Sequence, residues 1–285
     1  MNLVLGGGLA GLLLASKIKN SILIEVQNRI GGIFAYEEIG GNQIPLYPPL
    51  VDEKCENFPD FKYNEIVLNV DLQKERYLSE KLGVSDIPSW LLFTKNRIYY
   101  ISNMYQILDE LYKKTKVRLA TTFTYRGDKR FILSNGQVLK PDEVYVTVPP
   151  YLFGLKGGKS TGFAEAILLV NKARRSSTVI IDGDKGVSFS HVIIADWISE
   201  SFDVIYVLAP FTSQVPSWDR VFGDLKRKGI VRKEDIISFR YRIIKDALLE
   251  RAEEIELGGD FHFCGRLGKW KNFNICETID DVLHC

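Results

Sequence analysis

The chain has 285 residues, 46% of them hydrophobic and 26% charged, which is the composition of an ordinary globular protein with enough length for one large or two intertwined domains. The formal net charge of +1 gives no electrostatic reason to expect nucleic acid or an anionic membrane as a partner. No apolar run approaches the ~20 residues that span a bilayer, and no basic leader precedes the first expected strand at Asn2. We therefore expect a cytoplasmic protein without a membrane partner.

The cysteines and histidines form no metal-ligand pattern. The four cysteines share no C-x-x-C spacing and are Cys55, Cys264, Cys276 and Cys285. Disulfide frameworks and zinc sites usually depend on denser or more regular spacing. We therefore expect neither disulfides nor a metal, and we expect structural roles for His191 and His262, which fall in strand-like segments.

The first expected elements surround a G-x-G-x-x-G fingerprint. An apolar strand ends at Leu5 and an apolar helix begins near Leu9. In this motif the first glycine allows the tight turn, the second lets the backbone approach a pyrophosphate, and the third lets the helix pack closely on the sheet. These positions are Gly6, Gly8 and Gly11, and the free N–H groups at the start of the helix favour a diphosphate.

The next expected strand, residues 21–24, ends in an acid, Glu25, which follows Gly6 by 19 residues. A carboxylate at this distance receives the ribose hydroxyls of a dinucleotide, and it disfavours the 2′-phosphate of NADP. The alternative is a glycine-rich turn beside an ordinary surface acid. The order of strand, turn, helix, strand and acid is the context that supports nucleotide binding, so we expect a dinucleotide site.

Further along the chain, hydrophobic periodicity and turn residues indicate alternating helices and strands. The dipeptide Asn135-Gly136 predicts a hairpin turn. The expected helices are Asp71–Lys81, Asn103–Lys113, Val215–Gly229, Lys233–Ala252 and Asn274–Leu283. The expected strands are Ile39–Tyr47, Arg97–Ile101, Val117–Tyr125, Arg130–Leu133, Val138–Lys140, Val144–Val148, Gly162–Asn171, Ser177–Asp182, Val187–Ala195, Phe202–Ala209 and Phe261–Cys264.

Nucleotide-binding segments at both ends, with a β-rich insertion between them, predict a discontinuous two-domain α/β protein. The nucleotide-binding domain takes residues 1–50, 102–150 and 253–285. A smaller substrate domain, a mixed-sheet α+β unit, takes residues 51–101 and 151–252.

The N-terminus resembles the flavin amine oxidase superfamily, which includes protoporphyrinogen oxidase, UDP-galactopyranose mutase and the Rab GDP-dissociation inhibitors. The resemblance is carried by Gly6–Gly11, by Glu25, and by the R-x-G-G sequence of Arg29, Gly31 and Gly32. It implies FAD as the cofactor and a Rossmann-like, three-layer FAD-binding domain. Two further segments share it: 116–150, which looks like the adenine-side strands, and 263–279, whose G-R-L-G stretch is most similar to the mutases.

The resemblance also implies a set of cofactor contacts. The backbone at Phe123 would face the adenine, and Gly265 would let backbone amides approach the pyrophosphate. The whole implied set is Gly6, Gly8, Leu9, Ala10, Gly11, Glu25, Val26, Arg29, Gly31, Gly32, Ile33, Phe123, Gly265, Arg266, Asn274, Ile275 and Cys276.

The last expected helix begins with a capping-box pattern, in which Asn274 is the N-cap and Glu277 stands three positions on. We expect its N-terminus to point at the pyrimidine end of the flavin, where its partial positive charge would stabilise the reduced, anionic form. A capped surface helix without a ligand is the alternative.

Three departures from the mutase pattern weigh against that activity and leave FAD binding intact. Asn272 and Asn274 stand where the mutases have tyrosine and aspartate, and Trp270 and Phe273 replace other expected types. The stretch 46–50 lacks the histidine that usually lies over the flavin. Residues 51–100 are too few for the helical substrate lid.

No catalytic residue is assigned, because a flavin carries the chemistry and the protein supplies position and electrostatics. The candidates for the substrate pocket are Tyr47, Trp270 and Phe273. The alternative is that these aromatic side chains are ordinary core residues. Arg266 could contact an anion or form a salt bridge. Arg240, Arg242 and Lys245, on the helix expected before the last strand, either face the substrate or form a solvated charged face.

Three functions fit the sequence. The first is an FAD-dependent oxidoreductase that takes a hydride from a small molecule. The second is a UDP-galactopyranose mutase-like isomerase that uses reduced FAD. The third is a non-catalytic binding protein like the GDP-dissociation inhibitors. The small size and the missing lid are compatible with an open site completed by a partner chain, so a homodimer is one expectation.

Overall fold

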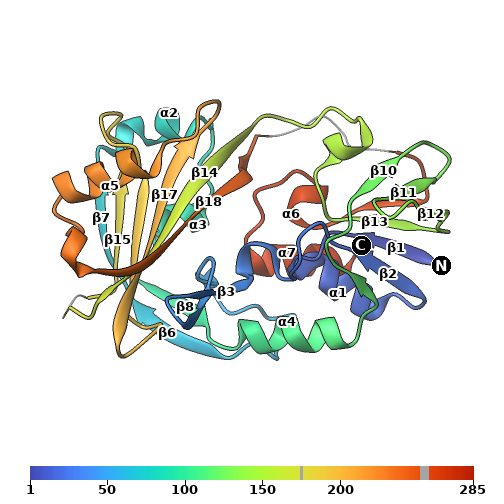
Figure 1. Ribbon diagram of the computed structural model, residues 1–285, viewed down its shortest axis with the longest axis horizontal. Helices are drawn as coiled ribbons and strands as arrows, with labels where there is room; N and C mark the ends of the chain where they lie inside the picture. The colour runs from blue at the N-terminus through green and yellow to red at the C-terminus, as the bar shows by residue number, and fades with distance from the viewer. Residues whose placement is uncertain (174–175, 251–256) are drawn as a thin grey trace.

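The computed structural model describes residues 1–173, 176–250 and 257–285. Two lobes lie side by side, each built on its own main sheet (Figure 1). The first lobe holds the N-terminus and the C-terminal helix, and the second is built largely from the middle of the chain (Figure 1).

The first lobe has three layers. Its central sheet is parallel throughout, in the order β19-β13-β1-β2-β9. One face is covered by three helices that share an apolar cluster, and the other by a small antiparallel sheet in the order β10-β11-β12. The central strands are β1 (Asn2–Leu5), β2 (Ser21–Ile24), β9 (Val117–Arg118), β13 (Val144–Val146) and β19 (Phe261–Phe263). The helices are α1 (Leu9–Lys17), α4 (Met104–Lys113) and α7 (Ile275–Leu283), and the small sheet is β10 (Phe123–Tyr125), β11 (Phe131–Leu133) and β12 (Val138–Leu139).

The second lobe is a six-stranded mixed sheet in the order β18-β14-β17-β16-β15-β7. Its pairs are antiparallel except that between β15 and β7. Helix α5 (Trp218–Arg227) packs on one face. The strands are β7 (Asn69–Gln73), β14 (Ser160–Asn171), β15 (Thr178–Asp182), β16 (His191–Ala195), β17 (Phe202–Phe211) and β18 (Ile236–Leu249).

The other face of this sheet is covered by residues from the first hundred positions, which join it in one apolar cluster. The short elements there are β3 (Tyr36–Ile39), β4 (Asn42–Pro45), β5 (Leu50–Val51), β6 (Tyr63–Val67), α2 (Leu78–Leu82), α3 (Ser89–Leu92) and β8 (Arg97–Ile101). They place the stretch 46–50 between the lobes, close to the last short helix, α6 (Gly265–Gly268).

The expected mixed α/β architecture is confirmed, whereas the domain boundaries stay a prediction. The expected hairpin at Asn135-Gly136 joins β11 to β12, and Gly136 has the positive φ of 82° that such turns require. The helices expected at Asn103–Lys113 and Asn274–Leu283 are α4 and α7. His191 is fully buried with hydrogen bonds to Ser190 and to the Leu91 carbonyl, which confirms its structural role.

Two predicted helices were wrong. Within Lys233–Ala252, residues 236–249 form the edge strand β18, and 251–252 lie outside the described residues. The segment pairs antiparallel with β14 over most of its length, and its aromatic and β-branched residues favour a strand once a partner is present. Within Asp71–Lys81, β7 runs to Gln73 and only residues 78–82 are α-helical, because β7 extends the sheet beside β15.

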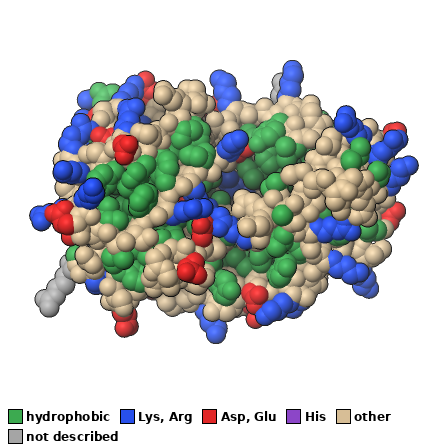
Figure 2. All heavy atoms as spheres, in the orientation of Figure 1, with side chains coloured by type: hydrophobic (Ala, Val, Ile, Leu, Met, Phe, Trp, Pro, Cys, Tyr) green, Lys and Arg blue, Asp and Glu red, His purple; other side chains and the backbone are tan. Residues whose placement is uncertain are grey.

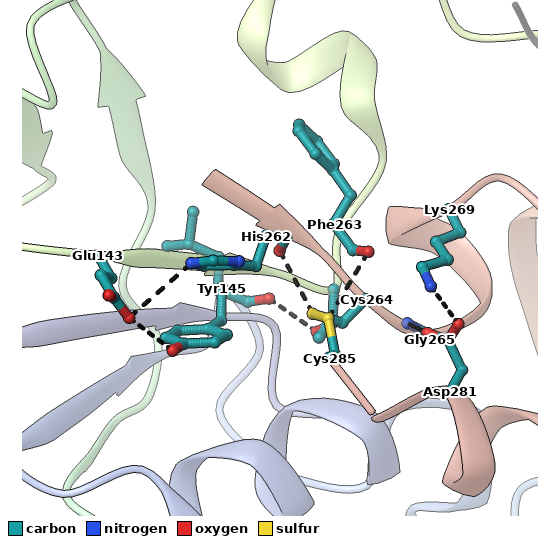
Figure 3. Close-up of a disulfide and its surroundings, with 11 residues drawn as sticks. Glu143, Tyr145, His262, Phe263, Cys264, Gly265, Lys269, Asp281 and Cys285 are labelled. Atoms are coloured by element: carbon teal, nitrogen blue, oxygen red, sulfur yellow. Dashed lines mark hydrogen bonds and ion pairs between the residues drawn. A yellow bond between two sulfur atoms is a disulfide. The ribbon is translucent and has the colours of Figure 1, made fainter. Parts of the chain in front are cut away.

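The expectation of no disulfides was also wrong. Cys55 pairs with Cys276 and Cys264 pairs with Cys285, with Cα atoms 5.0 and 6.0 Å apart. The first pair joins residues 221 apart in sequence, so spacing along the chain gave no sign of it. Both bonds hold the segment around α7: Cys276 lies in its first turn, and Cys285 lies just beyond its last turn, where Figure 3 shows the bond to Cys264.

Candidate functional site

The turn between β1 and α1 has the geometry that the glycine fingerprint predicts. Gly6 has a φ of +104°. A Cβ on Gly11 would lie 1.8 Å from the Gly6 carbonyl oxygen, so only glycine allows this close approach of helix and strand. A Cβ on Gly8 would meet nothing within 4 Å. The turn therefore packs tightly on its inner side and leaves open space at the N-terminus of α1, where the first backbone amides have no partner within the helix.

Glu25 lies beside this turn at the end of β2, with 9% of its surface exposed. Its two carboxylate oxygens accept hydrogen bonds from the backbone amides of Gly7 and Gln27, each at 2.6 Å. Each oxygen keeps a further lone pair for another donor. The acid is thus fixed at the rim of the turn, with capacity to accept from a pair of hydroxyl groups.

The second signature lies directly against the first. The Gly31 amide donates to the Gly7 carbonyl at 2.7 Å, and Gly8 and Gly31 form a parallel bridge. Gly31 and Gly32 both have positive φ. The Arg29 guanidinium pairs with Glu37, from Nη1 to Oε2 at 2.6 Å, while its Nε is buried without a partner in the described structure.

The remaining residues of the predicted set fall into three environments. Leu9 is buried, and Ala10 is partly exposed in the first turn of α1. Val26 and Ile33 lie on the rim, 61% and 38% exposed. Phe123 is in β10 with its ring 5.8 Å from those of Phe131 and Phe153, so its side chain belongs to the core and only its backbone could face a ligand.

The C-terminal segment closes against α1. A Cβ on Gly265 would lie 2.8 Å from that of Ala10, and Gly265 has a φ of +69°. The Gly265 amide donates to the Asp281 carboxylate at 2.7 Å, and Lys269 pairs with the same carboxylate (Figure 3). This amide is therefore engaged within the segment, and a direct contact between it and a pyrophosphate stays a prediction.

The capping box at the start of α7 is confirmed. The Asn274 side chain accepts from the Glu277 amide at 2.9 Å, and the Glu277 side chain accepts from the Asn274 amide at 2.8 Å. Ile275 is buried in the apolar cluster of the first lobe, and Cys276 is bonded to Cys55. Asn274 thus serves as the N-cap of α7.

Arg266 and Asn272 tie the lobes together. The Arg266 guanidinium donates to the carbonyls of Asp246 and Ala247 in β18, and no carboxylate in the described part of the chain forms a salt bridge with it. Burial lowers its pKa to about 10, partly offset by Asp246 and Tyr47. The Asn272 side chain both donates to and accepts from the Leu249 backbone, at 2.7 and 2.9 Å.

The aromatic candidates differ in exposure. Trp270 is 2% exposed and lies edge-on to Tyr151, so its side chain occupies a core position. Phe273 is partly buried, with the Lys271 ammonium 5.8 Å from its ring centre. Tyr47 is partly exposed between the lobes, 6.5 Å from the Tyr206 ring.

A buried ion pair lies beside Tyr47. Glu165 on β14 is fully buried and stands opposite Arg242 on β18, with which it forms a salt bridge. The second nitrogen of Arg242 donates to the Leu46 carbonyl at 3.0 Å, and Tyr206 donates to the Pro45 carbonyl at 2.8 Å. We call Tyr47, Glu165, Tyr206, Arg242 and Arg266 the interlobe cluster.

Electrostatics couple the members of the interlobe cluster. Burial raises the pKa of Glu165 to about 7, although Arg242 acts in the opposite direction. Burial and the nearby Glu165 charge raise the pKa of Tyr47, so its phenol stays protonated. Figure 2 shows a hollow near the middle of the viewed face, with lysine and arginine side chains around and within it.

The sequence interpretation missed Glu165 and misplaced its partner. Arg240, Arg242 and Lys245 were expected on a helix and lie on strand β18. Arg242 is inward and paired, Arg240 pairs with Glu37 at 3.1 Å, and Lys245 is exposed. A signal was present, since Glu165 is a single acid inside a ten-residue apolar strand pattern, and buried acids need a partner.

Two general classes of site find no support in the described ranges. No three histidine, cysteine, aspartate or glutamate residues there are grouped so that they could hold a metal. Among the same residues no helix has both the length and the apolar character that crossing a membrane requires.

Solved structures share this fold. The chain matches no protein-family model and no curated protein. It superimposes on a reduced UDP-galactopyranose mutase with a TM-score of 0.70 and 11% identity, covering 99% of this chain and 93% of the other. An oxidoreductase from Methanosarcina mazei gives 0.65 and 10%, with both chains fully covered. The PF1083 protein from Pyrococcus furiosus gives 0.61 and 10%, covering 99% and 96%.

These likenesses span the whole chain and establish the fold class, a mixed α/β architecture shared with a mutase and an oxidoreductase. At 10–11% identity they establish nothing about substrate or reaction.

Proposed function

We propose that the protein is an FAD-binding oxidoreductase that takes a hydride from a small-molecule donor. The observation that carries this proposal is the joint geometry of the two N-terminal signatures. Gly8 faces open space at the N-terminus of α1, Glu25 is held at the rim, and Gly31 is bridged to Gly8. A diphosphate fits the amides of α1, and a ribose fits the Glu25 carboxylate.

The residues present fit an extended dinucleotide. The diphosphate would lie at Gly8–Gly11, the ribose at Glu25, and the adenine near the backbone at Phe123. The isoalloxazine would extend toward α7 and Tyr47, where the lobes meet. The flavin, when bound, supplies the two-electron chemistry, and the chain supplies binding, orientation and exclusion of water.

The chain's own residues can orient a substrate at this junction. Tyr47 is partly exposed, and burial beside Glu165 keeps its phenol protonated, so it can donate a hydrogen bond. Arg266 and Asn272 fix the second lobe against the first through hydrogen bonds to the backbone of β18. A partner chain completing the site as a homodimer remains part of the proposal.

A mutase-like reaction is the second candidate, supported by the likeness to the reduced UDP-galactopyranose mutase. The replacements at Asn272 and Asn274 speak against it, and the Asn272 side chain is engaged by hydrogen bonds with the Leu249 backbone. A non-catalytic binding protein on the same fold, like the GDP-dissociation inhibitors, is the third.

The visible spectrum and cofactor mass of the purified protein separate these candidates. A flavin spectrum and the mass of FAD support the proposal, and a colourless protein that takes up no FAD supports the third candidate. Anaerobic bleaching by a panel of amine and alcohol donors supports the oxidoreductase. Turnover of UDP-galactopyranose only after dithionite reduction would instead support the mutase.

A further inference from the structure

All four cysteines form disulfides, and both bonds converge on the segment that would hold the flavin. Cys276 lies in the first turn of α7, and Cys285 directly follows His284, the C-cap of α7. Cys264 lies between β19 and α6, as the N-cap of α6 directly before Gly265. The first turn of α7 is therefore bonded to the loop after β5, and the residue after α7 is bonded to the residue before α6.

The two bonds differ in their surroundings. Cys264 is fully buried, and its bond to Cys285 lies between the end of β19 and the end of α7 (Figure 3). Cys55 is buried as well, and Cys276 and Cys285 are both partly exposed, so exposure does not separate the two bonds. They differ because Cys276 lies in the first turn of a capped helix. The amides and dipole of a helix N-terminus stabilise a thiolate there, which makes a cysteine in that position a better leaving group and a better nucleophile.

Besides the disulfide, the loop around Cys55 contacts α7 through one surface hydrogen bond and through a shared apolar cluster. The Asn57 side chain donates to Asp280 at 2.8 Å on the surface, and the Cys55 amide donates to the Tyr63 hydroxyl at 2.9 Å. Phe58 and Phe61 pack in the apolar cluster of the first lobe. Opening the bond would remove the covalent link between this loop and the first turn of α7, while the apolar cluster would keep the fold of the lobe in place.

We propose that the Cys55–Cys276 disulfide is a thiol-reactive site that controls cofactor retention, while Cys264–Cys285 is a structural bond. This inference rests on the proposed function, since it takes α7 as a wall of the FAD site. A small external thiolate attacks one sulfur, forms a mixed disulfide and releases the other cysteine as thiolate. A second external thiol then frees the first cysteine, so two thiols are oxidised to one disulfide and the protein gains two thiols.

The test uses the oxidised full-length protein with FAD bound. It is exposed to increasing dithiothreitol and sampled by alkylation and peptide mass. We expect Cys55 and Cys276 to be alkylated first, with the other pair protected until denaturant is added. Release of FAD, followed by its fluorescence, should accelerate about fivefold or more in step with alkylation of the first pair.

Two paired variants provide the controls. The variant with Cys55→Ala and Cys276→Ala should release FAD quickly, and dithiothreitol should not change that rate. In the variant with Cys264→Ala and Cys285→Ala, dithiothreitol should still accelerate FAD release. Equal reduction of both pairs in the unmodified protein, or unchanged FAD release after Cys55 and Cys276 are alkylated, would overturn the proposal without any variant. An oxidised protein that binds no FAD refutes the proposed function and the control of retention with it, while the alkylation order still reports which bond is accessible.

Discussion

Replacing Arg242 with methionine tests the electrostatics of the interlobe cluster. Methionine fills much of the space of the arginine stem but leaves the fully buried Glu165 without its counter-charge. Removing one partner of a buried ion pair costs about 3–5 kcal/mol. Glu165 can escape this cost by taking up a proton, so the penalty must depend on pH.

The sign follows from the direction of the Glu165 shift. The pKa of Glu165 is raised from 4.5 to about 7 in the folded protein. Above pH 4.5 the unfolded chain loses this proton and the folded chain keeps it, so stability falls by about 1.4 kcal/mol per pH unit until the folded pKa is passed. Without Arg242 the folded pKa rises further, so the variant keeps losing stability above pH 7 where the unmodified protein levels off.

Urea unfolding at pH 5 and pH 9 measures the effect. We expect Arg242→Met to be destabilised by about 3–5 kcal/mol at pH 9. At pH 5 Glu165 is protonated, so the variant loses the hydrogen bonds of Arg242 to Glu165 and to Leu46 without leaving a buried charge, at about 1–3 kcal/mol. The double variant Glu165→Gln with Arg242→Met should recover most of the loss at pH 9. An equal loss at both pH values would refute the assignment of Glu165 as a buried titrating acid.

Three further predictions concern the glycine turn, the lobe contact and a disulfide. Gly11→Ala places a Cβ 1.8 Å from the Gly6 carbonyl oxygen and should lower the melting temperature. The Cβ of Gly8→Ala meets open space, so this variant should keep the melting temperature of the unmodified protein and bind FAD about tenfold more weakly. Asn272→Ala loses both hydrogen bonds to Leu249, so its free energy of unfolding in urea should be about 1–3 kcal/mol lower. An unchanged free energy of unfolding would show that Asn272 does not stabilise the contact between the lobes. Replacing Cys264 and Cys285 by alanine removes a bond between residues 21 apart in sequence and should lower the free energy of unfolding by about 3 kcal/mol. Unfolding of the unmodified protein under oxidising and reducing conditions provides the comparison.

The sequence predicted those features that depend on short-range geometry. The roles of Gly6 and Gly11 follow from one turn, and the capping box of Asn274 and Glu277 spans three residues. The hairpin at Asn135-Gly136 is equally local. In each case the partners lie within a few residues of one another, so residue type and spacing contain most of the information.

The failures all involve partners that are distant in sequence. Residues 236–249 form a strand because β14, more than 60 residues earlier, offers a pairing edge. Cys55 meets Cys276 across a separation of 221 residues. The Glu165–Arg242 pair exists only in the register of β14 with β18, so Arg242 could not be distinguished from a surface charge without that pairing.

Titration of the cofactor-free protein with FAD tests the central claim most directly, with Glu25→Ala as the variant and Glu38→Ala as its control. Glu25 is nearly buried beside the glycine turn, whereas Glu38 is exposed on β3. Loss of charge-assisted hydrogen bonds to the ribose should weaken FAD binding about 10- to 100-fold in the first variant, and the second should bind like the unmodified protein. Equal FAD affinity in all three proteins, or no uptake of FAD by any, would contradict the placement of the cofactor at the N-terminal turn.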